Sequence, residues 1–219
     1  MFAIVRNDGE RRAVYFAMAV SYADEGNYIK AIDEMKKQYT LAKKINDYAG
    51  MAGDLIQMGN IYIEAGEPDE AMKKFAEAQK VMQGSNLSKE IKDNANRMFL
   101  YNSATVALDK KDFATAKAKL KQFHDQAVSL NNTFQIRQAH ELAGRIALDE
   151  KNYAVAINEF GLSNQQNPYN LYRIALAYKG KGDTNMAKEF CKRAVNFNAF
   201  NNINQAFIRL KAAKMLFSL

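Results

Sequence analysis

Five segments of this 219-residue chain share one short pattern, and this internal repeat constrains the fold more than any other feature. Each segment starts with tyrosine or alanine, breaks at glycine or lysine followed by Asn, Glu or Asp, and has an alanine nine positions after its start. The segments start at Tyr22, Tyr62, Ala107, Ala147 and Tyr178, so successive copies are 40, 45, 40 and 31 residues apart. A unit this short cannot bury its apolar face alone, so neighbouring copies must pack together.

Helix signals flank each break. Before the first break, Tyr15, Met18, Ala19 and Tyr22 fall three and four residues apart, which places them on one face of a helix. Glycine then supplies the left-handed residue that ends a helix, and Asn or Asp suits the cap of the next one. In the second copy, Pro68 stands where a first helical turn accepts proline. Each copy is therefore predicted to be a helical hairpin.

Small residues recur at two positions of every copy, twelve residues apart. Small side chains at both places would let the two helices of a hairpin approach closely. The pairs are Ala19 with Ala31, Gly59 with Ala71, Ala104 with Ala116, Gly144 with Ala156, and Ala175 with Ala187.

This constellation resembles the tetratricopeptide repeat family. The resemblance rests on "AVSY" (19–22), "GNIY" (59–62) and "ALAY" (175–178), on the turn glycines and second-helix alanines, and on Pro168. It implies an all-α fold, a right-handed α-solenoid of antiparallel helical hairpins. The sequence departs from the family where Ala107 and Ala147 replace tyrosine, and three spacings exceed the family's usual length of about 34 residues.

The expected domain is a single array over residues 1–219. The repeats are expected at about 12–46, 52–84, 95–130, 135–167 and 168–200, with a capping helix at 201–218. Turn-rich linkers are expected at 83–90, 164–170 and 196–202. The segment "FAIVRNDGE" (2–10) is interpreted as the end of a hairpin whose beginning is missing, so that the chain would be part of a larger protein.

The resemblance also implies a concave groove lined by the first helices of successive repeats. Exposed groove positions are expected one helical turn away from the inward small residue and tyrosine. They mix aromatic, amide and charged side chains, a combination that can hold an extended or helical peptide. The alternative for Phe16 and Ile56 is packing between neighbouring helices. The candidates are Phe16, Val20, Ile56, Gln57, Asn60, Tyr101, Asn102, Thr105, Gln138, Glu141, Arg145, Tyr169, Tyr172 and Arg173.

One subtype of the family holds a terminal carboxylate with a clamp of lysine, asparagine and arginine residues. Asn60 and Asn102 stand where the amides of that clamp would be. However, Ile56 replaces the first lysine, and Gln138 and Leu142 replace the last lysine and arginine. We therefore do not expect this chain to bind such a carboxylate.

Patterns that would carry catalysis, a cofactor or a metal are not found, so no enzyme and no cofactor is expected. The acidic turn in 22–32 lacks the alternating oxygens of a calcium loop, and Lys181 lies in a turn without the phosphate-loop motif. His124 and His140 lack partners at metal-ligand spacing, and His140 is interpreted as a satisfied packing residue. Cys191 is predicted to be a buried thiol.

The net charge is +7, and its densest basic patches are flanked by acidic residues. We interpret the charge as dispersed, which favours general solubility over nucleic-acid binding. A single cysteine excludes a disulfide within the chain and suits a reducing compartment. No stretch approaches the roughly 18 apolar residues that a membrane span requires. A soluble cytoplasmic protein is therefore expected.

The leading hypothesis is a non-enzymatic scaffold that binds a peptide or protein segment in its groove. The alternative is a regulatory or sensor domain of a longer signalling protein. Nucleic-acid binding is a third hypothesis, which rests on the charge alone. A homodimer is also conceivable, because solenoids with open ends can pair through them.

Overall fold

A computed structural model of the chain describes residues 7–197 and 201–219. In these residues the chain forms eleven α-helices and no β-strand, so the predicted all-α class is confirmed. The helices are α1 (Asp8–Asp24), α2 (Tyr28–Lys44), α3 (Tyr48–Glu64), α4 (Pro68–Gln83), α5 (Lys89–Asp109), α6 (Phe113–Ser129), α7 (Thr133–Asp149), α8 (Tyr153–Leu162), α9 (Pro168–Lys181), α10 (Thr184–Val195) and α11 (Ile203–Phe217).

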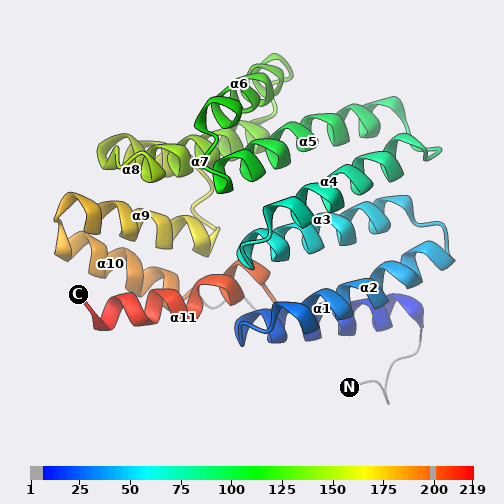
Figure 1. Ribbon diagram of the computed structural model, residues 1–219, viewed down its shortest axis with the longest axis horizontal. Coiled ribbons are helices and arrows are strands. Elements are labelled where there is room, and N and C mark those ends of the chain that lie inside the picture. The colour runs from blue at the N-terminus through cyan, green and yellow to red at the C-terminus, as the bar shows by residue number, and fades with distance from the viewer. Residues whose placement is uncertain (1–6, 198–200) are drawn as a thin grey trace. The chain divides into compact units, whose positions relative to one another are not determined.

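The helices form two compact units, Met1–Lys110 and Lys111–Leu219, here called the N-terminal and C-terminal units. Within each unit every helix packs against the next one along the chain (Figure 1). In the C-terminal unit α9 also packs against both α7 and α11, so alternate helices are in contact there. The predicted hairpins of copies one, two, four and five are confirmed, whereas copy three contributes α5 to one unit and α6 to the other. A single array over the whole chain stays a prediction.

Left-handed residues end the first helix of each predicted copy. Gly26, Gly66 and Gly182 have φ angles of 75°, 77° and 87°. In copies three and four the same place is taken by Lys111 and Lys151, with φ angles of 63° and 61°. Lysine has a Cβ that crowds the backbone in this conformation, so these two turns are strained where the glycine turns are not.

Replacing Lys151 by glycine should raise the free energy of unfolding by about 0.5–1 kcal/mol, because the left-handed strain disappears. Lys151 is exposed and forms no ion pair with a described residue, so little else is lost. Denaturant unfolding measures the change. The reciprocal Gly182→Lys change should lower the unfolding free energy by a similar amount through backbone strain. A steric clash adds nothing to this loss, because a Cβ built at Gly182 meets nothing within 4 Å. Equal stability of both variants and the wild type would contradict this reading of the turns.

In copies two and four, the small residue of the first helix is a glycine that faces a buried phenylalanine of the second helix. A Cβ built at Gly59 would lie 2.3 Å from Cε1 of Phe75, and one at Gly144 would lie 2.7 Å from Cδ1 of Phe160. Both rings are buried. Because the ring occupies the space that a methyl group would need, glycine fixes how closely the two helices of the hairpin can approach.

The Gly59→Ala change should lower the free energy of unfolding by about 1–3 kcal/mol, because the new methyl group collides with the Phe75 ring. The matched control is Gly53→Ala on the same helix, where a Cβ meets nothing within 4 Å. The control should stabilise the protein by up to about 1 kcal/mol through helix propensity. Chemical denaturation of both variants compares them, and an unchanged or raised stability of Gly59→Ala would refute the packing argument.

The first helices of copies one to three begin earlier than predicted. Asn7, Asp47 and Ser88 cap α1, α3 and α5, and each side chain accepts a hydrogen bond from a backbone N–H of the first turn. The interpretation of "FAIVRNDGE" as the end of a hairpin is thus wrong for residues 7–10, which begin α1. Residues 2–6 of that segment, and residues 198–200 of the predicted linker 196–202, lie outside the described residues.

Candidate functional site

Most groove candidates of the N-terminal unit are partly buried. Phe16 and Val20 lie on α1, and Ile56 and its neighbours on α3. The Asn60 side chain donates a hydrogen bond to Oε1 of Gln57, with a donor–acceptor distance of 3.4 Å. Tyr101 on α5 is partly buried as well. None of these side chains is fully exposed, so only their edges are accessible to a partner.

Two candidates are buried instead of exposed. Asn102 is 5% exposed and Thr105 is 6% exposed. They belong to a stretch of α5, residues 102–108, in which every residue is buried. The expectation of exposure is therefore wrong for Asn102 and Thr105, because the helical repeat gives a residue's direction but not what covers it.

An ion pair joins the first helices of copies one and two. Arg12 on α1 lies 3.1 Å from Asp54 on α3 and 2.7 Å from Asp47, the cap of α3. Burial raises the pKa of Asp54 to about 6 even though Arg12 opposes this, and the neighbouring Asp47 adds to the rise. Between pH 3.8 and about 6 the folded chain holds a proton that the unfolded chain has released, so the free energy of unfolding falls as the pH rises through this window.

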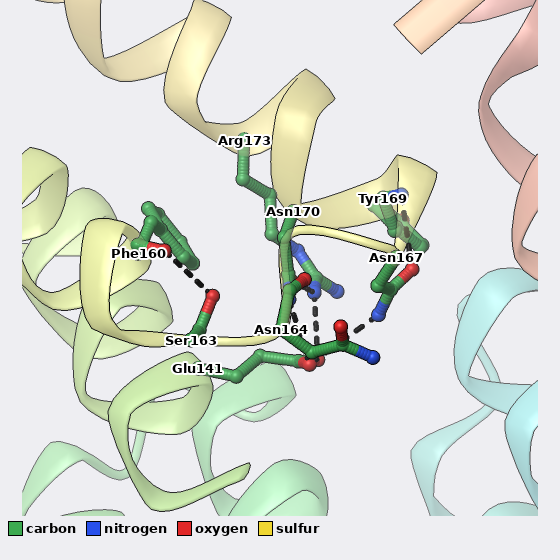
Figure 2. A network of polar contacts seen from close by, with 8 residues as sticks. All are labelled: Glu141, Phe160, Ser163, Asn164, Asn167, Tyr169, Asn170 and Arg173. Carbon is green, nitrogen blue, oxygen red and sulfur yellow. Dashed lines mark hydrogen bonds and ion pairs between the residues drawn. The ribbon is translucent and has the colours of Figure 1, made fainter. Parts of the chain in front are cut away.

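A polar network joins α7 to the start of α9 in the C-terminal unit (Figure 2). The two carboxylate oxygens of Glu141 are used separately. Oε1 accepts a hydrogen bond from Arg173 at 3.0 Å, and Oε2 accepts from the amides of Asn170 at 3.1 Å and Asn167 at 3.3 Å. One buried carboxylate on α7 therefore holds the N-terminal end of α9 in place.

The same network fixes the linker between α8 and α9. The Asn170 side chain, fully buried, also donates to the backbone carbonyl of Asn164 at 3.1 Å. Gln165 and Ser163 donate to the carbonyl of Phe160, with distances of 2.6 and 2.7 Å. Both carbonyls also accept a backbone hydrogen bond, Phe160 from the N–H of Ser163 and Asn164 from the N–H of Asn167, so the side chains reinforce the turn that follows α8.

The charges around Glu141 stabilise its ionised form. Burial alone would raise the pKa of Glu141, but Arg173, Arg145 and the hydrogen bonds together hold it below its ordinary value. The Arg173 guanidinium also lies over the Tyr169 ring, 3.8 Å from the ring centroid. Four predicted groove residues therefore interact with one another, and the pair of Glu141 with Arg173 links α7 to α9.

Replacing Glu141 by alanine should lower the free energy of unfolding by about 3 kcal/mol at neutral pH, because Arg173, whose side chain is 12% exposed, loses its counter-charge. The matched control is Glu150→Ala, which removes an exposed pair with Lys117 and should cost less than about 1 kcal/mol.

The effect of Glu141→Ala should shrink in acid. A carboxylate with a lowered pKa stabilises the fold above its unfolded pKa, here 4.5, and loses this contribution as the pH falls through its folded pKa. Urea unfolding at neutral pH and at acidic pH gives the comparison. A difference from wild type that does not depend on pH would contradict an ionised Glu141.

Tyr172 and Gln138 are the remaining groove candidates of the C-terminal unit. Tyr172 packs against the cluster of Ala175, Cys191 and Met215, and burial raises its pKa. Gln138 has a buried Oε1 that finds no hydrogen-bond partner among residues 7–197 and 201–219. Cys191 is fully buried, as predicted.

A histidine pair was missed by the sequence reasoning. The rings of His124 on α6 and His140 on α7 lie edge to face, with centroids 6.2 Å apart. Nδ1 of His140 lies 2.8 Å from Oε2 of Glu159, so the prediction of a satisfied histidine is confirmed. No signal within one helix could have joined two residues from neighbouring helices. In residues 7–197 and 201–219, no group of three or more His, Cys, Asp or Glu side chains could hold a metal ion.

An apolar hollow of about 200 Å³ lies between α3, α4 and α5 in the N-terminal unit. Two groove candidates, Ile56 and Asn102, belong to its lining. It has no charged residue in its walls, so it suits an uncharged group. The full lining is Ala49, Ala52, Gly53, Ile56, Phe75, Ala78, Gln79, Met82, Ile91, Asn94, Ala95, Met98, Phe99 and Asn102.

No helix among those described is both long enough and apolar enough to cross a membrane. A search of curated proteins gives no match. Among solved structures 27 chains match, one of them described as "Crystal structure of MamA protein". That chain is 18% identical with a TM-score of 0.40, and the alignment covers 86% of this chain and 92% of that chain.

A comparison with protein families matches residues 168–201 to the family described as Tetratricopeptide repeat. These residues contain α9 and α10, the hairpin that carries "ALAY" and the left-handed Gly182. Residues 168–201 therefore match a tetratricopeptide repeat, and the predicted resemblance to that family is confirmed over this segment.

Proposed function

We propose that this chain is a non-enzymatic scaffold that binds a peptide or protein segment. The tetratricopeptide repeat at 168–201 supports protein binding in general. The observation that carries the proposal further is the uncharged hollow between α3, α4 and α5. An apolar hollow of this kind can take an anchor side chain of a bound segment.

The size of the hollow favours a single side chain as its occupant. About 200 Å³ is smaller than the roughly 300–1,000 Å³ of pockets that bury drug-sized ligands. Met82 and Met98 line it, and flexible thioether side chains can adjust to the shape of an occupant. Gln57 lies on the same helix as several lining residues and carries a polar amide that can hydrogen-bond the backbone of the segment.

Filling the hollow tests the proposal. A Cβ built at Gly53 meets nothing within 4 Å, so Gly53→Leu can place a side chain in the hollow without straining the helix. Peptides selected from a random phage-displayed library on the wild-type chain should carry an apolar anchor. They should bind Gly53→Leu at least about tenfold more weakly.

The matched control is Gly161→Leu on α8, where a Cβ also meets nothing within 4 Å. The control should keep the affinity of the wild type for the selected peptides. Peptides that bind all three proteins equally would place the binding surface away from the hollow and would leave the groove candidates of α3 and α5 without support.

Absence of enzymatic activity, a cytoplasmic location and a homodimer stay predictions.

A further inference from the structure

The net charge of the chain lies wholly in its C-terminal quarter. Residues 168–219 contain nine Lys and Arg but two Asp and Glu, whereas residues 1–167 contain 22 of each kind. The whole charge of +7 therefore falls on α9, α10, α11 and their connections. The expectation of a dispersed charge is wrong, because it compared each basic patch only with its immediate neighbours.

Lys192 and Arg193 are among the basic residues of this segment that have no acidic partner within the described residues. Lys192 and Arg193 lie in the last turn of α10, and both are exposed. Neither forms an ion pair with any residue that the structure describes. By contrast, Lys44 in the last turn of α2 lies 3.3 Å from Asp8. Cations in the last turn of a helix stabilise it through the helix dipole. That interaction alone does not account for their position beside a hollow.

Lys192 and Arg193 border an open hollow of about 580 Å³ in the C-terminal unit. Its other walls carry the side-chain amides of Gln165, Gln166 and Asn196 and two apolar side chains, one of them Phe197. The lining contains no acidic residue. The Gln165 wall is held by its hydrogen bond to the Phe160 carbonyl, so this side of the hollow is ordered before any partner binds.

Arg193 is positioned by stacking. Its guanidinium carbon lies 4.5 Å from the centroid of the Phe190 ring, and Phe190 stacks in turn on Tyr178 with centroids 5.6 Å apart. Stacking on an aromatic face restrains a guanidinium while leaving its N–H edge available to a carboxylate. Less side-chain entropy is then lost when a carboxylate binds.

We propose that this basic hollow binds an acidic segment of a protein partner. Arg193 and Lys192 would hold carboxylates, and the amides of the walls would hydrogen-bond the backbone of the segment. Single-stranded nucleic acid fits less well, because it binds best where several free aromatic faces stack successive bases, and Phe197 is the single aromatic residue of this lining. Here the Tyr169 face carries Arg173 and Phe190 contacts both Arg193 and Tyr178. The proposal rests on the C-terminal unit alone and does not depend on the apolar hollow.

The test measures fluorescence anisotropy of a labelled glutamate-rich peptide with the full chain. The double variant Lys192→Glu, Arg193→Glu should weaken binding by about tenfold or more. The matched control is Lys43→Glu, Lys44→Glu, an adjacent pair in the last turn of α2 that lowers the net charge equally. The control should weaken binding only slightly, by roughly twofold, through the long-range field.

Thermal unfolding by circular dichroism establishes that both double variants are folded. Equal weakening by the two variants would overturn the proposal, since binding would then depend on net charge alone. Tighter binding of an oligonucleotide of equal charge than of the peptide, lost in the Lys192 and Arg193 variant, would overturn it in favour of nucleic acid. A glutamine-rich peptide of the same length should not bind.

The charge-conserving variant Arg193→Lys tests the stacked guanidinium. Lysine keeps the charge but loses the planar fork and the contact with Phe190, so binding of the glutamate-rich peptide should weaken by about threefold to tenfold. The Lys43→Arg variant should leave the affinity unchanged. An unchanged affinity of Arg193→Lys would contradict the assigned role of Arg193.

Discussion

The close contact between a glycine and a buried ring sets the geometry of two hairpins, α3–α4 and α7–α8. Gly59 and Gly144 leave the space that Phe75 and Phe160 fill, and no larger residue can stand there without moving the ring. The turn depends on the same contact, because its left-handed residue must return the chain at the distance that the ring allows. The apolar stripes of both helices then meet at this distance.

Contacts between repeats are partly ionic, and they lie on the first helices. Arg12 meets Asp54 in one unit, and Glu141 meets Arg173 in the other. The two carboxyl groups change the free energy of unfolding in opposite directions as the pH rises, since the pKa of Asp54 is raised and that of Glu141 is lowered. Neighbouring charges explain the difference first, because Arg145 adds to Arg173 beside Glu141 whereas Asp47 lies beside Asp54, and the Asn170 amide then lowers the pKa of Glu141 further. Charges that would mark a groove in the sequence are therefore used to hold neighbouring helices together.

Features set by local chemistry could be predicted from the sequence. Gly26 and Asn27 act through their own backbone and cap, so the turns and hairpins follow from a few adjacent residues. Features set by distant residues could not. The burial of Asn102 depends on which elements cover α5, and the pairing of Glu141 with Arg173 joins residues 32 positions apart. Both hollows arise from the fit between helices, which a periodic pattern does not specify. The uneven charge was present in the sequence and needed only to be summed by segment.

Residues other than glycine that adopt the left-handed conformation also affect local stability. Lys111, Asn131 and Lys151, with φ angles of 63°, 50° and 61°, stand before α6, between α6 and α7, and after α7. Opening any of these turns relieves backbone strain, so the free energy of local opening is reduced there relative to the glycine turns of α1 and α3. Amide hydrogens at the ends of α6 and α7 would then exchange with solvent sooner than those beside Gly26 and Gly66. The ends of these two helices are therefore places where part of the fold can open without unfolding of the whole chain.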